Sequence, residues 1–267
     1  MPFQAQSSRY QTAPAPWRYA LLGAALGLIL ALVFFAPAAW LGSSLATASQ
    51  GRLQLLDARG TVWRGSAWLL LTGGSGSRDS ATLPSRLDWT LRPTFSGFKV
   101  QLTTACCTPE PLRARIGLGW DTQTVQLDNA TSQWPAALLA GLGTPWNTVQ
   151  AQGILELTTQ TLSVKWSEGR AQLAGGAQLR ALDISSRLST VRPMGSYQLD
   201  LSGGAAPALA LTTLSGTLKL SGNGSWVGSR LRFSGIASVE PELVGAFTNL
   251  LNIIGRRQGV QSIITLG

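Results

Sequence analysis

The distribution of hydrophobic and polar positions divides the chain into two parts. Between residues 19 and 41 no residue is charged, and the middle of this segment consists almost entirely of Ala, Leu, Gly, Ile, Val and Phe. A helix rises about 1.5 Å per residue, so a segment of this length crosses the roughly 30 Å hydrocarbon core of a bilayer. Trp17, Tyr19 and Trp40 flank it, as aromatic side chains do at the headgroup layer. We therefore predict a transmembrane helix over residues 19–41.

The charges around this segment predict its orientation. Arg9 and Arg18 precede it, and no acidic residue does. Basic residues favour the cytoplasmic side, so we expect residues 1–18 to be a short cytoplasmic N-terminus and residues 42–267 to be translocated. A cleaved signal peptide is the alternative, because Ala46-Thr47-Ala48 has the small-x-small form of a cleavage site. The apolar run is longer than the about 7–15 residues of a signal peptide core, which favours an uncleaved anchor.

After Gly51 hydrophobic residues alternate with polar ones. Alternate residues of a β-strand point to opposite faces, so each such run has one apolar face and one polar face. The clearest runs cover residues 53–55, 86–91, 98–102, 112–118, 154–157, 162–166, 197–201, 214–220 and 231–233. Turns rich in Gly, Ser and Asn lie between them, which predicts antiparallel strands on a core. About a dozen strands exceed a small flat sheet, so we predict a mostly β domain built as a curled antiparallel sheet or a sandwich.

Two short helices are expected to interrupt the strands. The first covers residues 135–142, with proline at its first position and glycine after its end. The second covers residues 241–254, with proline and two glutamates at its start and one apolar stripe. Gly255, Arg256 and Arg257 are expected to end it, and a strand over residues 260–266 to follow. We expect this second helix to close one open end of the curled sheet.

A weak internal repeat is also present. Arg92-Pro93 and Arg192-Pro193 each follow a Ser-Arg-Leu segment, and each precedes a strand. Repeated turn chemistry alone would produce such a repeat, and a two-lobed domain would produce it as well. The two lobes would cover about residues 52–150 and 151–267.

The composition argues against catalysis. Histidine is absent, which removes the commonest general base and the commonest zinc ligand. Ser96 and Lys99 match the Ser-x-x-Lys pattern of acylating enzymes, but at a strand start they point to opposite faces. The acidic residues are scattered singly, apart from Glu240 and Glu242 at the helix start. We therefore expect no enzymatic activity, no cofactor, no metal and no small-molecule substrate.

Basic residues exceed acidic ones, with 21 Lys and Arg against 12 Asp and Glu and a net charge of +9. They occur singly and form no tract, so nucleic-acid binding is not expected. Near a membrane they would favour anionic lipid headgroups. The alternative is that they keep the polar faces of the strands soluble.

Cys106 and Cys107 are adjacent, and the chain has no other cysteine. In an oxidising compartment they could close a ring with each other or bridge to another chain. Neighbouring strand residues point to opposite faces, which disfavours the ring unless Thr108-Pro109 marks a turn. Two cysteines without histidine do not make a four-ligand zinc site.

Several short segments, in this order, resemble protein N of the bacterial type II secretion system, the general secretion pathway family GspN. After the N-terminal apolar segment they are 60–65 (Gly-Thr-Val-Trp-Arg-Gly), 87–93 (Leu-Asp-Trp-Thr-Leu-Arg-Pro), 224–226 (Gly-Ser-Trp), 231–235 (Leu-Arg-Phe-Ser-Gly) and 254–257 (Ile-Gly-Arg-Arg). They extend over nearly the whole chain, and their order and spacing carry the resemblance. It implies a non-enzymatic, accessory inner-membrane component of the machine that exports folded proteins from the periplasm across the outer membrane.

The resemblance implies an inner-membrane location, with one span, a cytoplasmic N-terminus and a periplasmic domain. The expected partners are other inner-membrane components of the secretion system and the lipid bilayer. Exposed sheet edges could pair with a partner by strand addition. The candidate partner contacts are Trp63, Arg64, Arg92, Arg192, Trp226, Arg256 and Arg257. Trp63 and Trp226 could instead fill the core at strand corners, and Arg92 and Arg192 could serve only as turn residues before proline.

A second hypothesis assigns the chain to lipid handling. Inner-membrane proteins of the AsmA-like kind also combine one N-terminal span with a long curled sheet whose apolar trough shields acyl chains. A continuous apolar groove with an open end would favour this hypothesis. A filled core with free polar edges would favour a scaffold.

Overall fold

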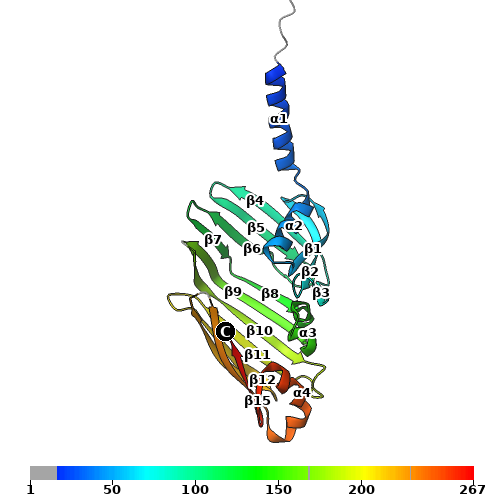
Figure 1. Cartoon of the computed structure of the whole chain (residues 1–267), viewed down its shortest axis with the longest axis vertical. Coiled ribbons are helices and arrows are strands. Elements are labelled where there is room, and N and C mark those ends of the chain that lie inside the picture. The colour runs from blue at the N-terminus through cyan, green and yellow to red at the C-terminus, as the bar shows by residue number, and fades with distance from the viewer. Residues whose placement is uncertain (1–16, 168, 229) are drawn as a thin grey trace, which may run out of the picture. The chain divides into compact units, whose positions relative to one another are not determined.

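The computed structural model describes residues 17–167, 169–228 and 230–267 (Figure 1). The chain divides into two compact units, residues 1–36 and residues 37–267. In the first unit, helix α1 covers Trp17–Phe34, and its apolar side chains are exposed, as with Leu22 at 67%. Residues 1–16 of the expected cytoplasmic N-terminus lie outside the described residues.

The apolar segment at residues 19–41 is not one helix. α1 ends at Phe34, and a second helix, α2 (Ala38–Ala48), begins after Pro37. Proline lacks an N–H donor and disfavours helical backbone at the preceding residue, so a break at this position is expected. Residues 37–41 therefore belong to the second unit, where Ala38 is buried beside Trp89. Within the described ranges, no helix combines the length and the hydropathy required to cross a membrane.

The second unit is built on one antiparallel sheet, which contains 16 strands among the described residues. The strands are β1 (Leu53–Gly60), β2 (Arg64–Thr72), β3 (Ser80–Thr82), β4 (Leu87–Thr94), β5 (Gly97–Thr104), β6 (Leu112–Leu118), β7 (Thr122–Leu127), β8 (Ala130–Pro135), β9 (Gln152–Ser167), β10 (Arg170–Ser185), β11 (Gly195–Ser202), β12 (Ala208–Gly216), β13 (Lys219–Val227), β14 (Arg230–Ser238), β15 (Arg256–Gln258) and β16 (Gln261–Leu266). The expected antiparallel, mostly β fold is confirmed.

Neighbours in the sheet follow the chain closely. The order is β1-β2-β4-β5-β6-β7-β9-β10-β11-β12-β13-β14-β16-β15, with β3 beside β2 and β8 beside β9. β9 spans 16 residues and pairs with β7 near its end and with β8 near its start. Because β9 pairs with both β7 and β8, the sheet continues across residue 150, and residues 37–267 form one compact unit.

Short helices pack on the apolar face of this sheet. They are the 3₁₀-helix η1 (Ala136–Leu142), α3 (Trp146–Val149), the 3₁₀-turn η2 (Pro241–Leu243) and α4 (Val244–Ile254). Both expected helical regions are present, but the first is a 3₁₀-helix that begins after Pro135, and the second begins with a 3₁₀-turn. The helix ends at Ile254 as expected; Gly255 is extended, and Arg256 and Arg257 form strand β15. The next residues pair with them as β16, so the chain enters the sheet directly after α4.

The largest core lies beneath α4. Phe247, Leu250 and Leu251 are at most 2% exposed, and they pack with Tyr197 and Leu218 from the sheet side. Burial of such side chains contributes about 1.5–3 kcal/mol each. α4 therefore covers the apolar face at one end of the sheet, as the amphipathic stripe predicted.

Candidate functional site

Among the described residues, no helix packs on the part of the sheet's apolar face that β5, β6 and β7 form. On β5, β6 and β7 the cross-strand partners Phe98, Ile116 and Val125 form one row. The next row on the same face contains Val100, Ala114 and Leu127. All six side chains are only half-buried, and none belongs to a buried core cluster. We refer to these six residues as the open apolar face.

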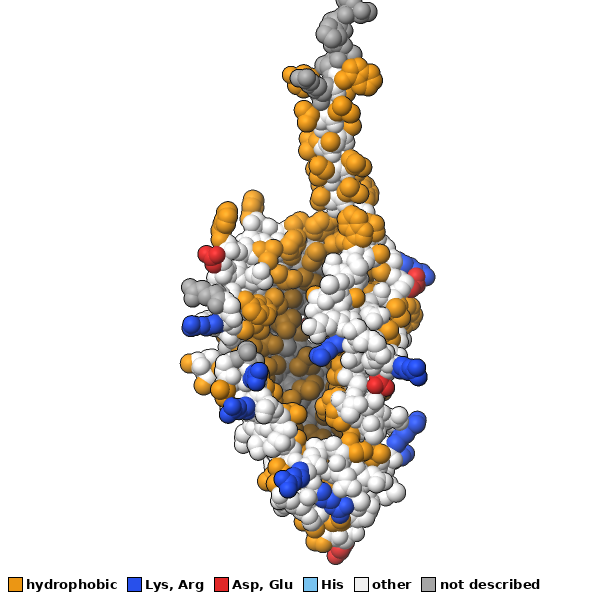
Figure 2. All heavy atoms as spheres, viewed as in Figure 1, with side chains coloured by type: hydrophobic (Ala, Val, Ile, Leu, Met, Phe, Trp, Pro, Cys, Tyr) orange, Lys and Arg blue, Asp and Glu red, His pale blue; other side chains and the backbone are white. Residues whose placement is uncertain are grey.

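Figure 2 shows what this face produces at the surface. An elongated hollow runs over the middle of the second unit, and hydrophobic side chains form most of its floor. Basic and acidic side chains lie on the walls and outer surface around it. A half-exposed apolar surface is unfavourable in water, so a hollow of this kind is typical of a binding surface.

At one edge of the sheet, large apolar side chains project from the ends of neighbouring strands. Phe95 in the β4–β5 turn is 115% exposed, and Trp120 in the β6–β7 turn is 104% exposed. Leu118 at the end of β6 is 50% exposed, and Trp166 near the end of β9 is 42% exposed. A shallow hollow of about 520 Å³ lies between Trp120 and Trp166. We refer to Phe95, Leu118, Trp120 and Trp166 as the aromatic edge.

The turns of the aromatic edge lie side by side because of the strand register. Thr94 pairs with Gly97 across the β4–β5 turn, and Gly97 pairs with Gly117 of β6. The backbone N–H of Leu118 then donates to the carbonyl of Ser96, with N and O 2.8 Å apart. Gly97 has a φ of 148°, and a side chain there would collide with the Ile116 carbonyl. Glycine therefore allows these two turns to approach each other closely.

The opposite face of the same strands carries a row of cations. Arg92 of β4 pairs with Lys99 of β5, and Lys99 pairs with Arg115 of β6. Arg115 is paired with Asp128 at 3.1 Å, whereas Arg92 and Lys99 make no ion pair with a described residue. Like charges directly opposite one another on a sheet are destabilising. We refer to Arg92, Lys99 and Arg115 as the basic row.

Three of the candidate contact residues lie together beside this region. Trp63 is half-buried in the β1–β2 turn, with its ring centroid 6.4 Å from that of Phe98. Its carbonyl accepts the Leu91 N–H at 2.7 Å. Arg64 pairs with Thr90, two residues before Arg92, so both arginines lie on the same face of the sheet. Trp63, Arg64 and Arg92 therefore surround the same end of β2 and β4.

The other four candidates lie elsewhere. Trp226 is half-buried on β13 opposite Leu231. Arg192 is exposed in the β10–β11 loop, at the opposite edge from the turns of the aromatic edge. Arg256 is exposed on β15, and Arg257 is half-buried and donates through Nε to the Gly259 carbonyl at 3.2 Å. The seven candidates do not form one site.

Phe95 and Trp120 were not among the residues singled out from the sequence. Both lie in turns, where Gly, Asn, Asp and Ser are the usual residues. An aromatic residue flanked by turn residues, as in Gly119-Trp120-Asp121, was the available signal. The alternation of apolar and polar residues identifies only residues within strands, so it does not identify an aromatic residue in a turn.

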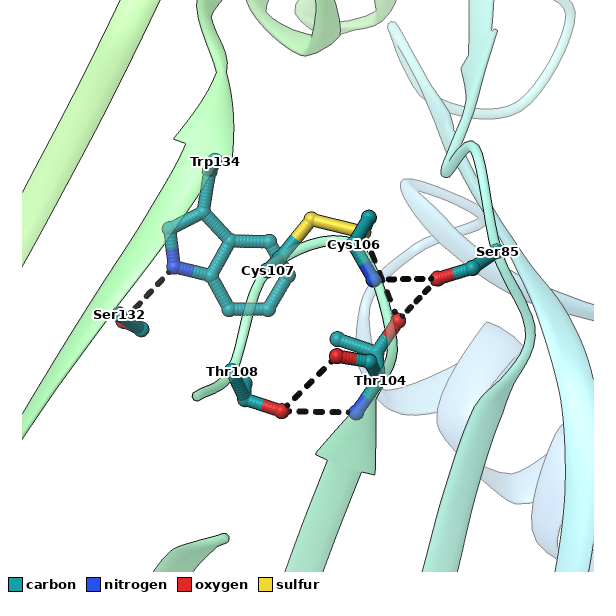
Figure 3. The surroundings of a disulfide bond; sticks show 7 residues. All are labelled: Ser85, Thr104, Cys106, Cys107, Thr108, Ser132 and Trp134. Atoms are coloured by element: carbon teal, nitrogen blue, oxygen red, sulfur yellow. Dashed lines mark hydrogen bonds between the residues drawn. A yellow bond between two sulfur atoms is a disulfide. The ribbon is translucent and has the colours of Figure 1, made fainter. Parts of the chain in front are cut away.

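The adjacent cysteines form a disulfide with each other (Figure 3). The ring was expected only if a turn followed, and a turn does follow β5 here. The Thr104 N–H donates to Thr108 Oγ1 at 2.8 Å, and this hydroxyl donates back to the Thr104 carbonyl at 3.0 Å. Cys106 N–H donates to Ser85 Oγ at 3.0 Å. The pair is therefore part of a hydrogen-bonded turn.

The two cysteines differ in environment. Cys106 is exposed, whereas Cys107 is 2% exposed in a small core with Leu83 and Leu138. Trp134 of β8 packs against this core. The turn after β5 therefore packs against β8 and η1.

Two ionisable groups have shifted pKa values. Hydrogen bonds from Arg86 and then Arg59 lower the pKa of the exposed Asp57 carboxyl. Both guanidinium groups lie 2.8 Å from this carboxylate. Burial raises the pKa of Tyr197, whose hydroxyl donates to the Leu218 carbonyl at 3.2 Å. Each shift is explained by packing or pairing within the sheet.

Among the described residues no three His, Cys, Asp or Glu side chains are grouped so that they would hold a metal ion. The arrangement therefore offers two surfaces for binding, the open apolar face and the aromatic edge with its basic row.

Comparisons with known proteins give one match. The family model described as type II secretion system (T2SS), protein N, matches residues 51–263. No curated protein and no solved structure matches the chain.

Proposed function

The chain belongs to the type II secretion system protein N family, and from this premise we propose that it is an accessory inner-membrane component of that system. It would support the export of folded proteins from the periplasm across the outer membrane. The family match carries this proposal, because residues 51–263 include nearly all of the sheet. Its action would be to bind partners and not to catalyse a reaction.

A membrane location is part of the proposal. The uncharged part of the chain before Pro37, residues 19–36, supports it, together with the exposed leucines of α1. Exposed apolar side chains in such number are costly in water, whereas a bilayer or another apolar helix would cover them. The domain from residue 42 onward would lie in the periplasm, consistent with an oxidised cysteine pair.

The proposed partners are other inner-membrane components of the same system. Confinement to a membrane raises the effective concentration of partners, so weak contacts suffice. Trp63, Arg64 and Arg92 lie together, and both arginines are exposed. This corner of the sheet is therefore the best-supported of the candidate contact regions.

An export assay with purification from native membranes tests the proposal. Removal of the gene should lower the amount of folded protein exported to the medium, and the full chain should restore it. Other secretion components should co-purify with the full chain from detergent-solubilised membranes. Unchanged export together with the recovery of no secretion component would contradict the proposal.

Lipid handling is the second candidate function, because of the open apolar face. Its half-buried rows face a hollow with a hydrophobic floor, as an acyl-chain site requires (Figure 2). The core under α4 is filled, so such a groove would be closed at that end. Solvent extraction of the purified full chain should then yield bound phospholipid, and Ala114→Glu should lower its amount several-fold. Lys219→Glu, an exposed change of charge at the start of β13, is the matched control.

A further inference from the structure

The aromatic edge exposes its largest side chains where the fold gains nothing from them. Phe95 and Trp120 are as exposed as in an extended chain, at 115% and 104%. Both occupy turns, where small or polar residues would serve the backbone equally well. Their apolar surface is therefore available to something outside this unit.

These side chains lie at one edge, not on scattered loops. The register places the β4–β5 and β6–β7 turns at the same end of the sheet, and the hydrogen bond between Leu118 and Ser96 joins them. Thr122 of β7 pairs with Ser167 of β9, so Trp166 lies at this end as well. Four large apolar residues thus project from the β4–β5 turn, the end of β6, the β6–β7 turn and the end of β9.

The chain enters the unit at this edge too. Pro37, the first residue of the unit, pairs with Thr61 in the β1–β2 turn. That turn lies beside the last residues of β4, because the Trp63 carbonyl accepts the Leu91 N–H. Trp40, in the first turn of α2, is 52% exposed. The segment before Pro37 is the one that the proposed function assigns to the bilayer, and the present inference rests on that assignment.

The basic row lies at a distance from the aromatic edge that suits contact with lipid phosphates. Arg92 and Lys99 lie three and four residues from Phe95, which places them about 10 Å behind the tip at strand spacing. Aromatic side chains favour the headgroup layer, and Lys and Arg are attracted to anionic phosphates. An anionic surface would also relieve the repulsion between Arg92 and Lys99. Asp121, beside Trp120, and Asp128, which is paired with Arg115, oppose this attraction.

We propose that the aromatic edge docks on an anionic phospholipid bilayer, with Phe95 and Trp120 inserted at the headgroup layer and the basic row facing the phosphates. Docking would hold the sheet in one orientation on the membrane.

Spin labels in the full chain test this proposal. Single variants Phe95→Cys and Trp120→Cys are labelled with a nitroxide, because the native cysteines are paired in a disulfide. Trp146→Cys is the matched control, since Trp146 is an aromatic residue with 42% exposure in α3, at the opposite edge. The chains are reconstituted into vesicles of phosphatidylcholine with or without phosphatidylglycerol. Accessibility is then measured to oxygen, which concentrates in lipid, and to a water-soluble nickel chelate.

Labels at positions 95 and 120 should be accessible to oxygen and shielded from nickel in anionic vesicles, whereas the label at position 146 should be accessible to nickel. The double change Arg92→Gln and Lys99→Gln should lower the ratio of membrane-inserted to water-exposed labels at positions 95 and 120 by about fivefold per charge removed. The same double change should have little effect in phosphatidylcholine alone. A fold check by circular dichroism distinguishes lost docking from unfolding.

Each other result overturns the proposal. If the vesicles retain the chain but positions 95 and 120 remain as accessible to nickel as position 146, the edge does not dock, and the membrane anchor proposed above still stands. If addition of solubilised secretion components is needed to shield the labels from both reagents, the edge is a protein contact. If the chain fails to float with vesicles of either composition, both the anchor and the docking surface are refuted.

Discussion

Two regions of the sheet's apolar face differ in whether a helix covers them. Beneath α4 the face is covered, and Phe247 and Leu251 are fully buried. Over the open apolar face of β5, β6 and β7 no helix of the described residues packs, and Phe98 and Val125 remain half-buried. The strands of both regions have the same alternation of apolar and polar residues. Alternation therefore determines which face is apolar, and a separate element determines whether that face becomes core.

The difference predicts where the unit's stability resides. A fully buried side chain loses transfer free energy and leaves a cavity when it is truncated, whereas a half-exposed one loses part of the first and little of the second. The covered end should therefore respond strongly to substitution, and the open apolar face should respond weakly. The substitutions below, from the largest expected effect to the smallest, test that contrast in the full chain in detergent.

Truncation of one phenylalanine in each region gives the sharpest contrast. Phe247→Ala, at 0% exposure, should lower the free energy of unfolding by about 3–5 kcal/mol. Phe98→Ala, its matched control on the open apolar face, should cost about half as much or less. Urea unfolding followed by circular dichroism measures both. Equal losses would mean that the open face is as much a core as the face beneath α4.

The disulfide turn offers a second contrast, between two cysteines that share one bond. Cys106→Ser and Cys107→Ser both remove the disulfide, but only Cys107 is buried. A hydroxyl in that small apolar core should cost about 1–3 kcal/mol more than one at Cys106. The difference between the two variants' urea midpoints measures it. Identical midpoints would show that the bond itself, and not burial, matters.

The buried Tyr197 makes the stability of the covered core depend on pH. Burial raises the pKa of Tyr197, so the folded state favours the neutral phenol. This contribution is fully present below the unfolded pKa of about 10 and is lost as pH rises above it. Tyr197→Phe should cost about 1 kcal/mol at pH 7, from the lost hydrogen bond to Leu218. Above about pH 10 the wild type should lose stability faster than the variant, and parallel pH profiles of the melting temperature would refute the assignment.

Exchange of valine for its polar isostere should give the smallest effect on the open face. Val100→Thr places a hydroxyl where water already reaches, so the expected cost is below about 0.5 kcal/mol. Val239→Thr, at 6% exposure in the core beneath α4, is the matched control and should cost about 1–2 kcal/mol. A large loss at Val100 would indicate that something covers the hollow even in the isolated chain.

The strand alternation predicted the sheet but not its cover. The runs at 86–91 and 98–102 became β4 and β5, because period-two alternation depends only on local backbone geometry. The stripe around Phe247 predicted that its helix would be buried on one face, and it is. Which strands lie beneath α4 depends on the order of the strands in the sheet, and no local pattern encodes that order.

Other differences follow from single residues. Pro37 divided the apolar segment into α1 and α2, although its composition is uniform on both sides. The adjacent cysteines lie in a turn after β5 that the Thr108 hydroxyl closes by hydrogen bonds to Thr104, a condition that spacing alone left open. Of the candidate contacts, Trp63, Arg64 and Arg92 lie together, since strand pairing joins residues that are distant in sequence. The aromatic edge required knowing which turns share an end of the sheet.

The two terminal strands of the sheet are poorly suited to self-association. β1 is interrupted at Asp57, where φ is 48° and the register with β2 shifts. β15 is only three residues long, and two of them are arginines. An edge strand that is interrupted, short or charged offers few unpaired N–H and C=O groups to the backbone of another chain. Copies of the chain should therefore remain separate and not join into a continuous sheet, and a partner would bind turns or faces more readily than the edge strands.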